Sequence, residues 1–326
     1  MKSIKLWLLT AVLIFNSDNI FSEYKNTNGK PIEKSFQDLI KWSANNVETK
    51  IDYIKISEEW KDINFEEDDG FAVWIGHSTF LIKKNGYTIL TDPVFSERAS
   101  PLKRIGPKRL IPPAIPIDKL PSIDFITVSH NHYDHLDTAS LSELYLANPN
   151  AIFLVPVGDK KLLKRKGIKN VFEYNWWDKH QENNLEITFT PVQHWSKRGL
   201  FDRNQSLWGG WFFKFDDFSI YHAGDTGYSN DFIDTRVKLG SPKYAFIPIG
   251  AYAPEWFMAE SHVNPEGAIK IMIDLGAESS FGMHWATFKL TDEDTLEPKK
   301  RLEVAIKNKN MDNFVAPTPG EIIHLN

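Results

Sequence analysis

The 326-residue sequence contains no cysteine. This absence excludes disulfide bonds, thiolate zinc sites and cysteine nucleophiles. It also excludes attachment of a lipid to a cysteine side chain. Any metal ion that the chain binds must therefore be held by nitrogen and oxygen atoms.

The sequence also lacks a marked excess of charge of either sign. The 38 basic and 43 acidic residues give a formal net charge of −5, which offers no electrostatic basis for binding nucleic acid. Glycine- or serine-rich linkers, low-complexity tracts and solenoid repeats are absent as well. With 42% hydrophobic and 13% aromatic residues, we expect a folded globule with a sizeable core and one catalytic domain.

The apolar run near the N-terminus, "LWLLTAVLIF" (6–15), is shorter than the roughly 20 residues of a membrane span. Lys2 and Lys5 precede it and Ser22 offers a place for cleavage, a pattern typical of a secretory signal. We therefore expect residues 1–22 to be a signal peptide or N-terminal anchor, and the protein to be exported, periplasmic or membrane-associated. A buried N-terminal helix in a cytoplasmic protein is the alternative.

The pattern of apolar and turn-forming residues changes at about residue 70. Residues 23–69 form a predicted lead-in segment with one amphipathic helix, whose apolar face we expect to carry Phe36, Leu39 and Ile40. Residues 70–326, the predicted catalytic domain, contain short strands interleaved with helices. This alternation predicts an α/β fold in which two sheets pack together with helices outside.

Two predicted hairpins have similar construction. The segment "TFLIKKNGYTILTDP" (79–93) turns at its Asn-Gly pair, and "GWFFKFDDFSIYHAGD" (210–225) turns at its Asp-Asp pair. Each hairpin runs directly into an aspartate, Asp92 in the first and Asp225 in the second. We interpret this as a faint internal duplication, with two halves of similar construction.

The segment "SHNHYDHLD" (129–137) follows an apolar run that predicts a buried strand. Loops at strand ends are where α/β proteins usually carry their chemistry. His130 and His132 are two residues apart, so both side chains can leave one face of an extended segment and bind one ion. Asp134 and His135 can bind a second ion. Imidazole and carboxylate together suit zinc and similar divalent metals.

Further ligands are expected at the ends of other strand-like runs, and three residues qualify: His194, Asp225 and His284. Asp225 can offer one oxygen to each ion and bridge the two. The predicted first site is His130, His132, His194 and Asp225, and the predicted second site is Asp134, His135, Asp225 and His284. Two zinc ions at these sites could activate a water for attack on an ester, because zinc lowers the pKa of bound water to about 7.

The order of these ligands resembles that of the metallo-β-lactamase superfamily. More narrowly, several motifs resemble the N-acylphosphatidylethanolamine-hydrolysing phospholipase D family: "WIGHSTFLI", "LTDPVFSERASP", "SHNHYDHLD", "PVQHWSKRG", "GDTGY", "HVNPEGA" and "HWATFKLTDED". The resemblance runs from about residue 70 to about residue 320. The lead-in before residue 70 does not match the family, and Ala286 stands where the family has glycine.

This resemblance implies a metallo-β-lactamase-like four-layer αβ/βα sandwich of two mixed β-sheets. It implies two zinc ions, with Mn²⁺ or Fe²⁺ as alternatives, and hydrolysis of a phospholipid at a peripheral membrane surface. The implied reaction converts N-acylphosphatidylethanolamine to N-acylethanolamine and phosphatidic acid. Another diester could replace this substrate, because substrate choice in such a family depends on loops. A homodimer remains an open alternative to a monomer.

Asp134, at the second ion, and His262 are the predicted catalytic residues. The "HVNPE" motif lies near the cleft in the family that this chain resembles. His262 could therefore stabilise charge on a phosphoryl oxygen or protonate the leaving alcohol. A structural role is its alternative. Asp92 is predicted to accept the free ring N–H of a ligand histidine, or to cap a turn, and His77 to line the cleft or make a structural hydrogen bond.

A basic and apolar rim for anionic phospholipid is predicted from two loops. The loop 98–109 supplies the basic side chains, and the segment "AYAPEWFM" (251–258) supplies the aromatic ones. The predicted rim residues are Arg98, Lys103, Arg104, Lys108, Arg109, Tyr252, Trp256 and Phe257. A solvated basic loop without a partner is the alternative.

Three other functions compete with phosphodiester hydrolysis. A lactonase or other ester hydrolase of the same fold would use the same metals without a basic rim. Redox or oxygen chemistry at two irons is a second alternative. It favours a carboxylate in place of the second histidine, so His132 argues against it. An exported metal-binding protein without catalysis would have little need for the second, open site at Asp134.

Overall fold

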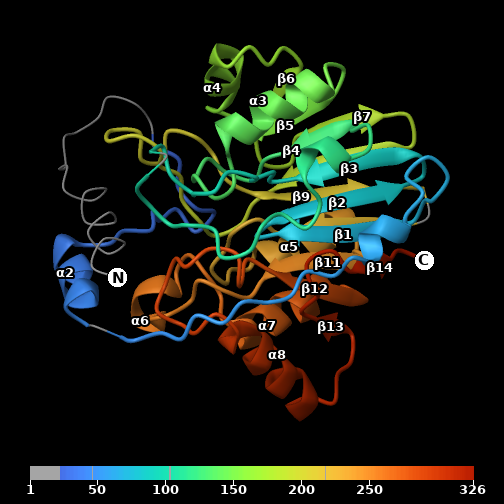
Figure 1. The fold of residues 1–326 in the computed structure, drawn as a ribbon. Coiled ribbons are helices and arrows are strands. Elements are labelled where there is room, and N and C mark those ends of the chain that lie inside the picture. The colour runs from blue at the N-terminus through green and yellow to red at the C-terminus, as the bar shows by residue number, and fades with distance from the viewer. Residues whose placement is uncertain (1–22, 46, 103, 217) are drawn as a thin grey trace.

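The computed structural model describes residues 23–45, 47–102, 104–216 and 218–326. Two seven-stranded sheets lie face to face, with helices on their outer sides (Figure 1). Both sheets mix parallel and antiparallel pairing, which confirms the predicted fold class. The predicted signal peptide or anchor, residues 1–22, lies outside the described residues.

The first sheet has the strand order β14-β1-β2-β3-β4-β5-β6. Pairing is antiparallel from β14 to β3 and parallel from β3 to β6. Its strands are β1 (Phe71–Gly76), β2 (Thr79–Lys84), β3 (Tyr87–Thr91), β4 (Phe125–Thr127), β5 (Ile152–Pro156), β6 (Val171–Tyr174) and β14 (Ile322–His324).

The second sheet has the order β13-β12-β11-β10-β9-β8-β7. Pairing is antiparallel from β7 to β10 and parallel from β10 to β13. Its strands are β7 (Lys179–Glu182), β8 (Leu185–Thr190), β9 (Gly210–Lys214), β10 (Ser219–His222), β11 (Tyr244–Pro248), β12 (Ser279–Met283) and β13 (Phe314–Val315).

The two predicted hairpins occupy equivalent places in the two sheets. The pair β2–β3 is antiparallel, and so is the pair β9–β10. In each case the second strand also begins the parallel half of its sheet and leads into an aspartate, Asp92 after β3 and Asp225 after β10. The two halves of the molecule are therefore built alike, and each brings one aspartate to a strand end.

Helices cover the outer faces of both sheets. Helices α3 and α4 lie over the first sheet, and α7 and α8 lie under the second (Figure 1). The helices are α2 (Phe36–Ala44), α3 (Thr138–Ala147), α4 (Lys160–Arg165), α5 (Asp231–Leu239), α6 (Glu255–Met258), α7 (Pro265–Leu275) and α8 (Glu297–Asn308), with short 3₁₀ turns η1 (Glu59–Asp62) and η2 (Ile117–Lys119).

The core fills both the space between the sheets and the space under the helices. Between the sheets, the rings of Phe80 and Phe246 stack with centroids 4.1 Å apart. On the outer face of the first sheet, Val73 and Ile75 of β1 pack with residues of α3 and α4. Because β1 is buried on both faces, its sequence "FAVWIG" is apolar throughout.

Helix α2 lies within the predicted lead-in, but its buried face differs from the predicted one. Leu39 is buried as expected, whereas Phe36 and Ile40 are 45% and 48% exposed. Trp42 takes their place in the buried face, at 3% exposure. Apolar residues occupy both sides of this helix, so periodicity alone could not select the packed side. None of the helices in the described part of the chain combines the length and apolar character needed to cross a bilayer.

Candidate metal centre

The histidine-rich segment lies between the end of β4 and the start of α3. Backbone N–H groups of His135 and Leu136 donate to the carbonyl of His132, at 3.1 and 2.8 Å, and form a tight turn. Asp137 then caps α3 by accepting from the N–H of Ala139 at 3.1 Å. This turn, which lies between the end of β4 and the cap of α3, holds the backbone that carries the histidines and Asp134 in one conformation.

The first group of candidate ligands contains three histidines. His132 Nδ1 lies 2.8 Å from His130 Nε2 and 3.3 Å from His194 Nε2. Ligand atoms at the usual zinc–nitrogen distance around a tetrahedral ion lie about 3.3 Å apart. The three imidazoles are therefore spaced as they would be around one ion.

The opposite ring nitrogens of two of these histidines make hydrogen bonds that fix their tautomers. His194 Nδ1–H donates to the carbonyl of Ser261 at 3.0 Å. His130 Nδ1–H donates to Ser129 Oγ, also at 3.0 Å. In both rings the Nε2 lone pair is left to face the neighbouring histidines, as metal ligation requires.

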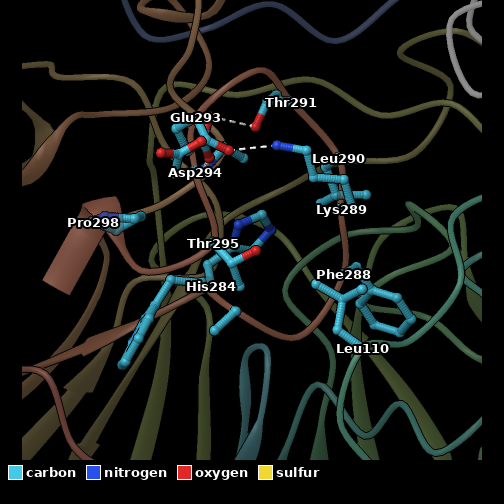
Figure 2. Close-up of a pocket in the computed structure, with 13 residues that line it drawn as sticks. Leu110, His284, Phe288, Lys289, Leu290, Thr291, Glu293, Asp294, Thr295 and Pro298 are labelled. Atoms are coloured by element: carbon cyan, nitrogen blue, oxygen red, sulfur yellow. Dashed lines mark hydrogen bonds between the residues drawn. The ribbon is translucent and has the colours of Figure 1, made fainter. Parts of the chain in front are cut away.

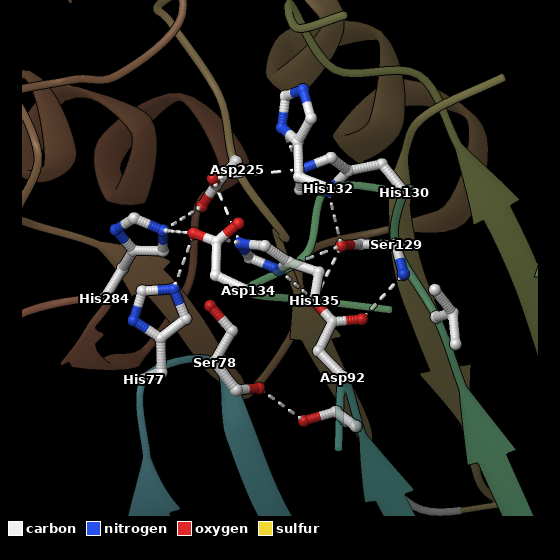
Figure 3. Close-up of polar contacts among 12 residues, drawn as sticks. His77, Ser78, Asp92, Ser129, His130, His132, Asp134, His135, Asp225 and His284 are labelled. Atoms are coloured by element: carbon white, nitrogen blue, oxygen red, sulfur yellow. Dashed lines mark hydrogen bonds and ion pairs between the residues drawn. The ribbon is translucent and has the colours of Figure 1, made fainter. Parts of the chain in front are cut away.

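The second group gathers around Asp134 (Figure 3). Asp134 Oδ2 lies 3.7 Å from His135 Nε2 and 3.4 Å from His284 Nε2. His77 Nε2–H donates to the same oxygen at 3.0 Å. His77 thus contacts Asp134 directly, and its position is compatible with supporting that carboxylate or joining the ligands.

Asp225 lies between the two groups. Its Oδ2 is 3.1 Å from His135 Nε2 and 3.9 Å from both His130 Nε2 and His194 Nε2. Its Oδ1 is 3.1 Å from His284 Nε2. All seven predicted ligands therefore lie together, and Asp225 is the residue that would be shared if each group held an ion.

Close approach of two loops makes this arrangement possible. Gly224, just before Asp225, has φ +61°, and a Cβ there would lie 2.6 Å from the side chain of Ser129. Any larger residue at this position would push the Asp225 loop away from the histidine segment.

Asp92 is fully buried behind the ligands (Figure 3). Its Oδ1 accepts from Ser129 N–H at 2.6 Å. Its Oδ2 accepts from Ser129 Oγ–H at 2.6 Å and from His135 Nδ1–H at 2.7 Å. Asp92 thus contacts the hydrogen-bearing nitrogen of a candidate ligand, and Ser129 donates to both of its oxygens.

Burial and the two carboxylates divide the histidines by charge. Burial lowers the pKa of His132 to about 3 and holds the pKa values of His130 and His194 well below the ordinary range. Burial opposes the charge on His284 too, but Asp225 and Asp134 raise its pKa to about 9. The first group is therefore neutral and ready to bind a cation, whereas at the second group a metal ion would replace a proton.

The unpaired atoms of the cluster fit a pair of divalent ions. Among the described residues, the buried polar atoms without a hydrogen-bond partner include Asp225 Oδ1 and the Nε2 atoms of His135 and His284. Buried polar groups normally have partners. Nitrogen and oxygen donors turned inward without partners are what a binuclear metal site requires, and these clusters are consistent with one.

The loop after β12 holds His284 (Figure 2). Glu293 organises this loop by accepting from Thr291 Oγ1 at 2.7 Å and from the backbone N–H of Ala251 at 2.6 Å. His284 and Ala286 have φ values of +64° and +53°. A left-handed backbone at Ala286 explains why glycine suits this position in the family that the motifs resemble.

A cavity of about 510 Å³ opens onto the cluster, and His132, Asp134, Asp225 and His262 line its inner end. His262 Nδ1 lies 3.9 Å from Asp225 Oδ2 and has no hydrogen-bond partner among the described residues. Burial lowers the pKa of His262 to about 4. At neutral pH this side chain is therefore a neutral imidazole, which can donate a hydrogen bond but carries no charge.

Several predicted rim residues do not lie on an exposed rim. Tyr252 is only 1% exposed, and its hydroxyl donates to Glu297 at 2.7 Å. Arg109 turns inward and donates to the carbonyls of Val94 and Ser96. These two predictions were wrong because both side chains fill gaps between loops, which the sequence does not reveal.

The other predicted rim residues are spread over the cavity and its surroundings. Phe257 is 6% exposed and lines the cavity wall. Arg98 is half-buried and donates to the carbonyl of Gly106 at 2.7 Å. Arg104, Lys108 and Trp256 are exposed. Lys108 pairs with Glu97 at 3.0 Å. Lys103 lies outside the described residues.

One buried contact behind His194 could not be predicted from the sequence. Asn26 Oδ1 accepts from the backbone N–H of His194 and from Trp208 Nε1–H, both at 3.0 Å. Asn26 is 4% exposed, although it lies in the lead-in segment. In sequence it resembles an ordinary turn residue in "NTNGK", so only the fold reveals this partner.

Comparison with known proteins agrees with this geometry. The β-lactamase superfamily domain matches residues 87–285. The chain is also 39% identical over 274 residues to N-acyl-phosphatidylethanolamine-hydrolyzing phospholipase D 1 of Caenorhabditis elegans, covering 79% of this chain and 77% of that relative. The chain belongs to the metallo-β-lactamase superfamily. Its ligand order and its strand-end site are those of a metal-dependent hydrolase in this superfamily.

One further relative and one solved structure define the extent of this similarity. The mitochondrial N-acyl-phosphatidylethanolamine-hydrolyzing phospholipase D of Saccharomyces cerevisiae is 41% identical over 251 residues, which cover 73% of this chain and 53% of that protein. Igni18, a metallo hydrolase from Ignicoccus hospitalis, superposes with a TM-score of 0.59 at 23% identity, covering 79% of this chain and 98% of that structure. The last comparison supports the metallo-β-lactamase fold alone.

Proposed function

We propose that this metallo-β-lactamase-superfamily hydrolase cleaves a phosphodiester bond in a phospholipid of the N-acylphosphatidylethanolamine type, releasing an N-acylethanolamine and a phosphatidic acid. The observation that carries the proposal is the make-up of the cavity above the metal centre. One part of its wall is apolar, with Phe257, Met258 and Leu290, and another part is basic, with Arg198 and Arg203. An amphiphile with an anionic phosphoester matches both parts. The identity to the nematode and yeast phospholipases D supports the same substrate class.

The seven candidate ligands would hold two zinc ions, with Mn²⁺ or Fe²⁺ as alternatives. Such ions, when bound, supply an activated nucleophile near neutral pH and offset the charge on phosphoryl oxygens. Asp134 lines the cavity, and its pKa is well below the ordinary range because His135, His284 and His77 outweigh the effect of burial. As an ionised carboxylate it can accept a hydrogen bond from the attacking water and orient it.

His262 lines the same end of the cavity as Asp134. Because its pKa is about 4, it acts as a neutral N–H donor to a phosphoryl oxygen or to the departing oxygen. Of the roles expected from the sequence, hydrogen-bond donation by the neutral ring is therefore favoured, because the cationic imidazole is disfavoured in the free protein. The negative charge of a bound phosphodiester would raise this pKa and favour proton donation to the leaving alcohol.

Access from a membrane surface is part of the proposal. Exposed apolar side chains lie within or beside the cavity-lining segments: Phe36, Leu102, Ile105, Leu200, Phe201 and Trp256. Exposed Arg104 and Lys108 lie in the same loop as Leu102 and Ile105. Apolar groups beside cations suit the interface of a bilayer that contains anionic lipid.

The deciding experiment compares bis-p-nitrophenyl phosphate with p-nitrophenyl acetate, each with and without a chelator. A phosphodiesterase should cleave the first substrate in a chelator-sensitive reaction and the second only slowly. Mass spectrometry of lipids after incubation with a mixed membrane extract should then show an N-acylethanolamine and a phosphatidic acid. Faster chelator-sensitive cleavage of the acetate would instead support a lactonase or other ester hydrolase.

A further inference from the structure

The N-terminal strap, defined as residues 24–45, forms part of the cavity above the metal centre. Lys34, Leu39 and Trp42 line this cavity together with the metal-centre residues at its inner end. The superfamily domain, in contrast, matches only residues 87–285. Part of the cavity wall therefore comes from a segment outside the matched domain.

The lining face of α2 is fixed by packing against α6. Leu39 and Trp42 are each 3% exposed and form a cluster with Phe257 and Met258. The Trp42 ring stacks on Phe257 with centroids 5.0 Å apart. Trp42 Nε1–H also donates to Asp292 Oδ2 at 2.6 Å. Ring stacking together with a hydrogen bond to a carboxylate holds the indole in one orientation.

Other contacts hold the strap at its start and along its length. Ser35 and Asp38 form a capping box that begins α2. Just before it, Lys34 Nζ pairs with Glu260 Oε2 at 3.0 Å and lies 5.1 Å from the centre of the Phe257 ring. Arg203 donates to the carbonyl of Ile32. The strap is thus tied to α6 and to the loop that follows His194.

The size of the cavity limits how much of a phospholipid it can enclose. A volume of about 510 Å³ falls among ordinary small-molecule pockets and suits one head group with a single chain. A whole phospholipid with several acyl chains is larger than such a pocket. The remaining chains would lie outside, where the exposed apolar residues flank the cavity.

We propose that Leu39 and Trp42 are specificity-determining residues, which form a wall for one unbranched apolar chain of the substrate and so set its preferred length. This inference rests on the proposed function for the identity of the substrate. The wall itself depends only on the packing of α2 against α6. Residues on the opposite, exposed face of α2, such as Ile40, should have no influence on chain length.

The test uses metal-loaded protein and p-nitrophenyl alkyl phosphodiesters with alkyl chains from ethyl to dodecyl, kept below their micellar concentrations. For wild type, kcat/KM should rise by up to about fourfold per methylene until the chain meets the wall. Leu39→Trp should shift this limit to shorter chains, and Trp42→Ala should shift it to longer ones. Ile40→Trp is the matched control, because it adds the same side chain on the exposed face.

Binding of alkyl phosphate monoesters, measured by calorimetry, separates this inference from the proposed function. Suppose that no diester is cleaved, but the longest alkyl chain that binds becomes shorter in Leu39→Trp and stays the same in Ile40→Trp. The proposed reaction is then wrong, whereas the role of Leu39 and Trp42 in limiting chain length is supported. If wild type and Leu39→Trp have the same chain-length limit for both cleavage and binding, that role is refuted. Should Trp42→Ala fail to fold, Leu39→Trp and its control still decide.

Discussion

Replacing Asp92 by asparagine tests how the metal centre sets the tautomer of His135. Asp92 Oδ2 accepts from His135 Nδ1–H at 2.7 Å, which leaves the lone pair of Nε2 to face Asp134 and Asp225. In the variant, the amide oxygen can still accept from Ser129 N–H, which leaves the NH₂ group facing His135. An NH₂ donor there favours the tautomer with hydrogen on Nε2, and that tautomer cannot bind a metal ion through Nε2.

The size of the effect follows from this change of tautomer. Loss of such a partner behind a metal ligand typically weakens metal binding by about 10- to 100-fold, equal to about 1.4–2.7 kcal/mol. We expect this loss at the site of His135. The other site should change little, because the carbonyl of Ser261 still holds the tautomer of His194.

Competition with a chromophoric chelator, resolved into two zinc affinities, measures the effect. Asp124→Asn is the matched control: Asp124 lies at the opposite end of β4, and its carboxylate accepts from the N–H of Thr88 at 2.8 Å. Two zinc affinities equal to those of wild type would refute the tautomer argument. Equal weakening at both sites would indicate general damage to the fold rather than loss of one ligand.

Three further predictions concern catalysis, pH dependence and targeting. His262→Ala should keep both metals but lose about 10²- to 10⁴-fold in turnover of a diester with a poor leaving group, and far less with p-nitrophenolate; equal losses on both would make His262 a substrate clamp. Burial raises the pKa of Asp159 from 3.8 to about 7, so the folded state binds this proton more tightly than the unfolded chain, and stability falls as the pH rises through that window. Asp159→Asn should therefore gain stability relative to wild type between pH 5 and pH 8, by up to about 4 kcal/mol in denaturant unfolding, and no gain would contradict the argument. We also propose export: residues 1–30 fused to a reporter that works only outside the cytoplasm should give signal, and a cytoplasmic fusion would contradict this.

The fold and the clustering of the seven candidate ligands could be predicted because their signals are local. A hairpin with an Asn-Gly turn, an apolar strand and a histidine-rich loop are each contained within about fifteen residues of sequence. Strand ends of one direction meet at the same edge of each sheet. Ligands as far apart in sequence as His130 and His284 could therefore be assigned to one site.

The residues that support the ligands could not be predicted, because their partners are remote in sequence. Asn26 and His194 are 168 positions apart, and Trp42 and Asp292 are 250 apart. Nothing in the local pattern marks Asn26 or Trp42 as different from a turn residue or an exposed aromatic. The wrong assignment of Tyr252 to the rim has the same origin, since its partner Glu297 comes from a separate helix.

The contact between Asn26 and the His194 loop makes the lead-in segment part of the metal centre. If Asn26 becomes alanine, the buried N–H of His194 loses its acceptor, whereas Trp208 Nε1–H keeps the carbonyl of Val192 at 3.1 Å. An unsatisfied buried donor costs about 1–3 kcal/mol. Asn26→Ala should therefore lower the free energy of unfolding by this amount. Asn26→Asp keeps an acceptor oxygen at this position and should retain most of the wild-type stability.

Truncation provides an independent test of the same contact. Tyr24 N–H donates to the carbonyl of Asn204 at 2.8 Å, so removal of residues 1–22 leaves both this bond and Asn26 in place. We expect that truncated protein to bind two zinc ions as the full chain does. Removal of residues 1–30 deletes both contacts and should weaken the site of His194 at least as much as Asn26→Ala, while the other site retains its affinity. If the shorter truncation already loses zinc, residues 1–22 belong to the folded domain; if the longer one keeps both affinities, Asn26 has no part in positioning His194.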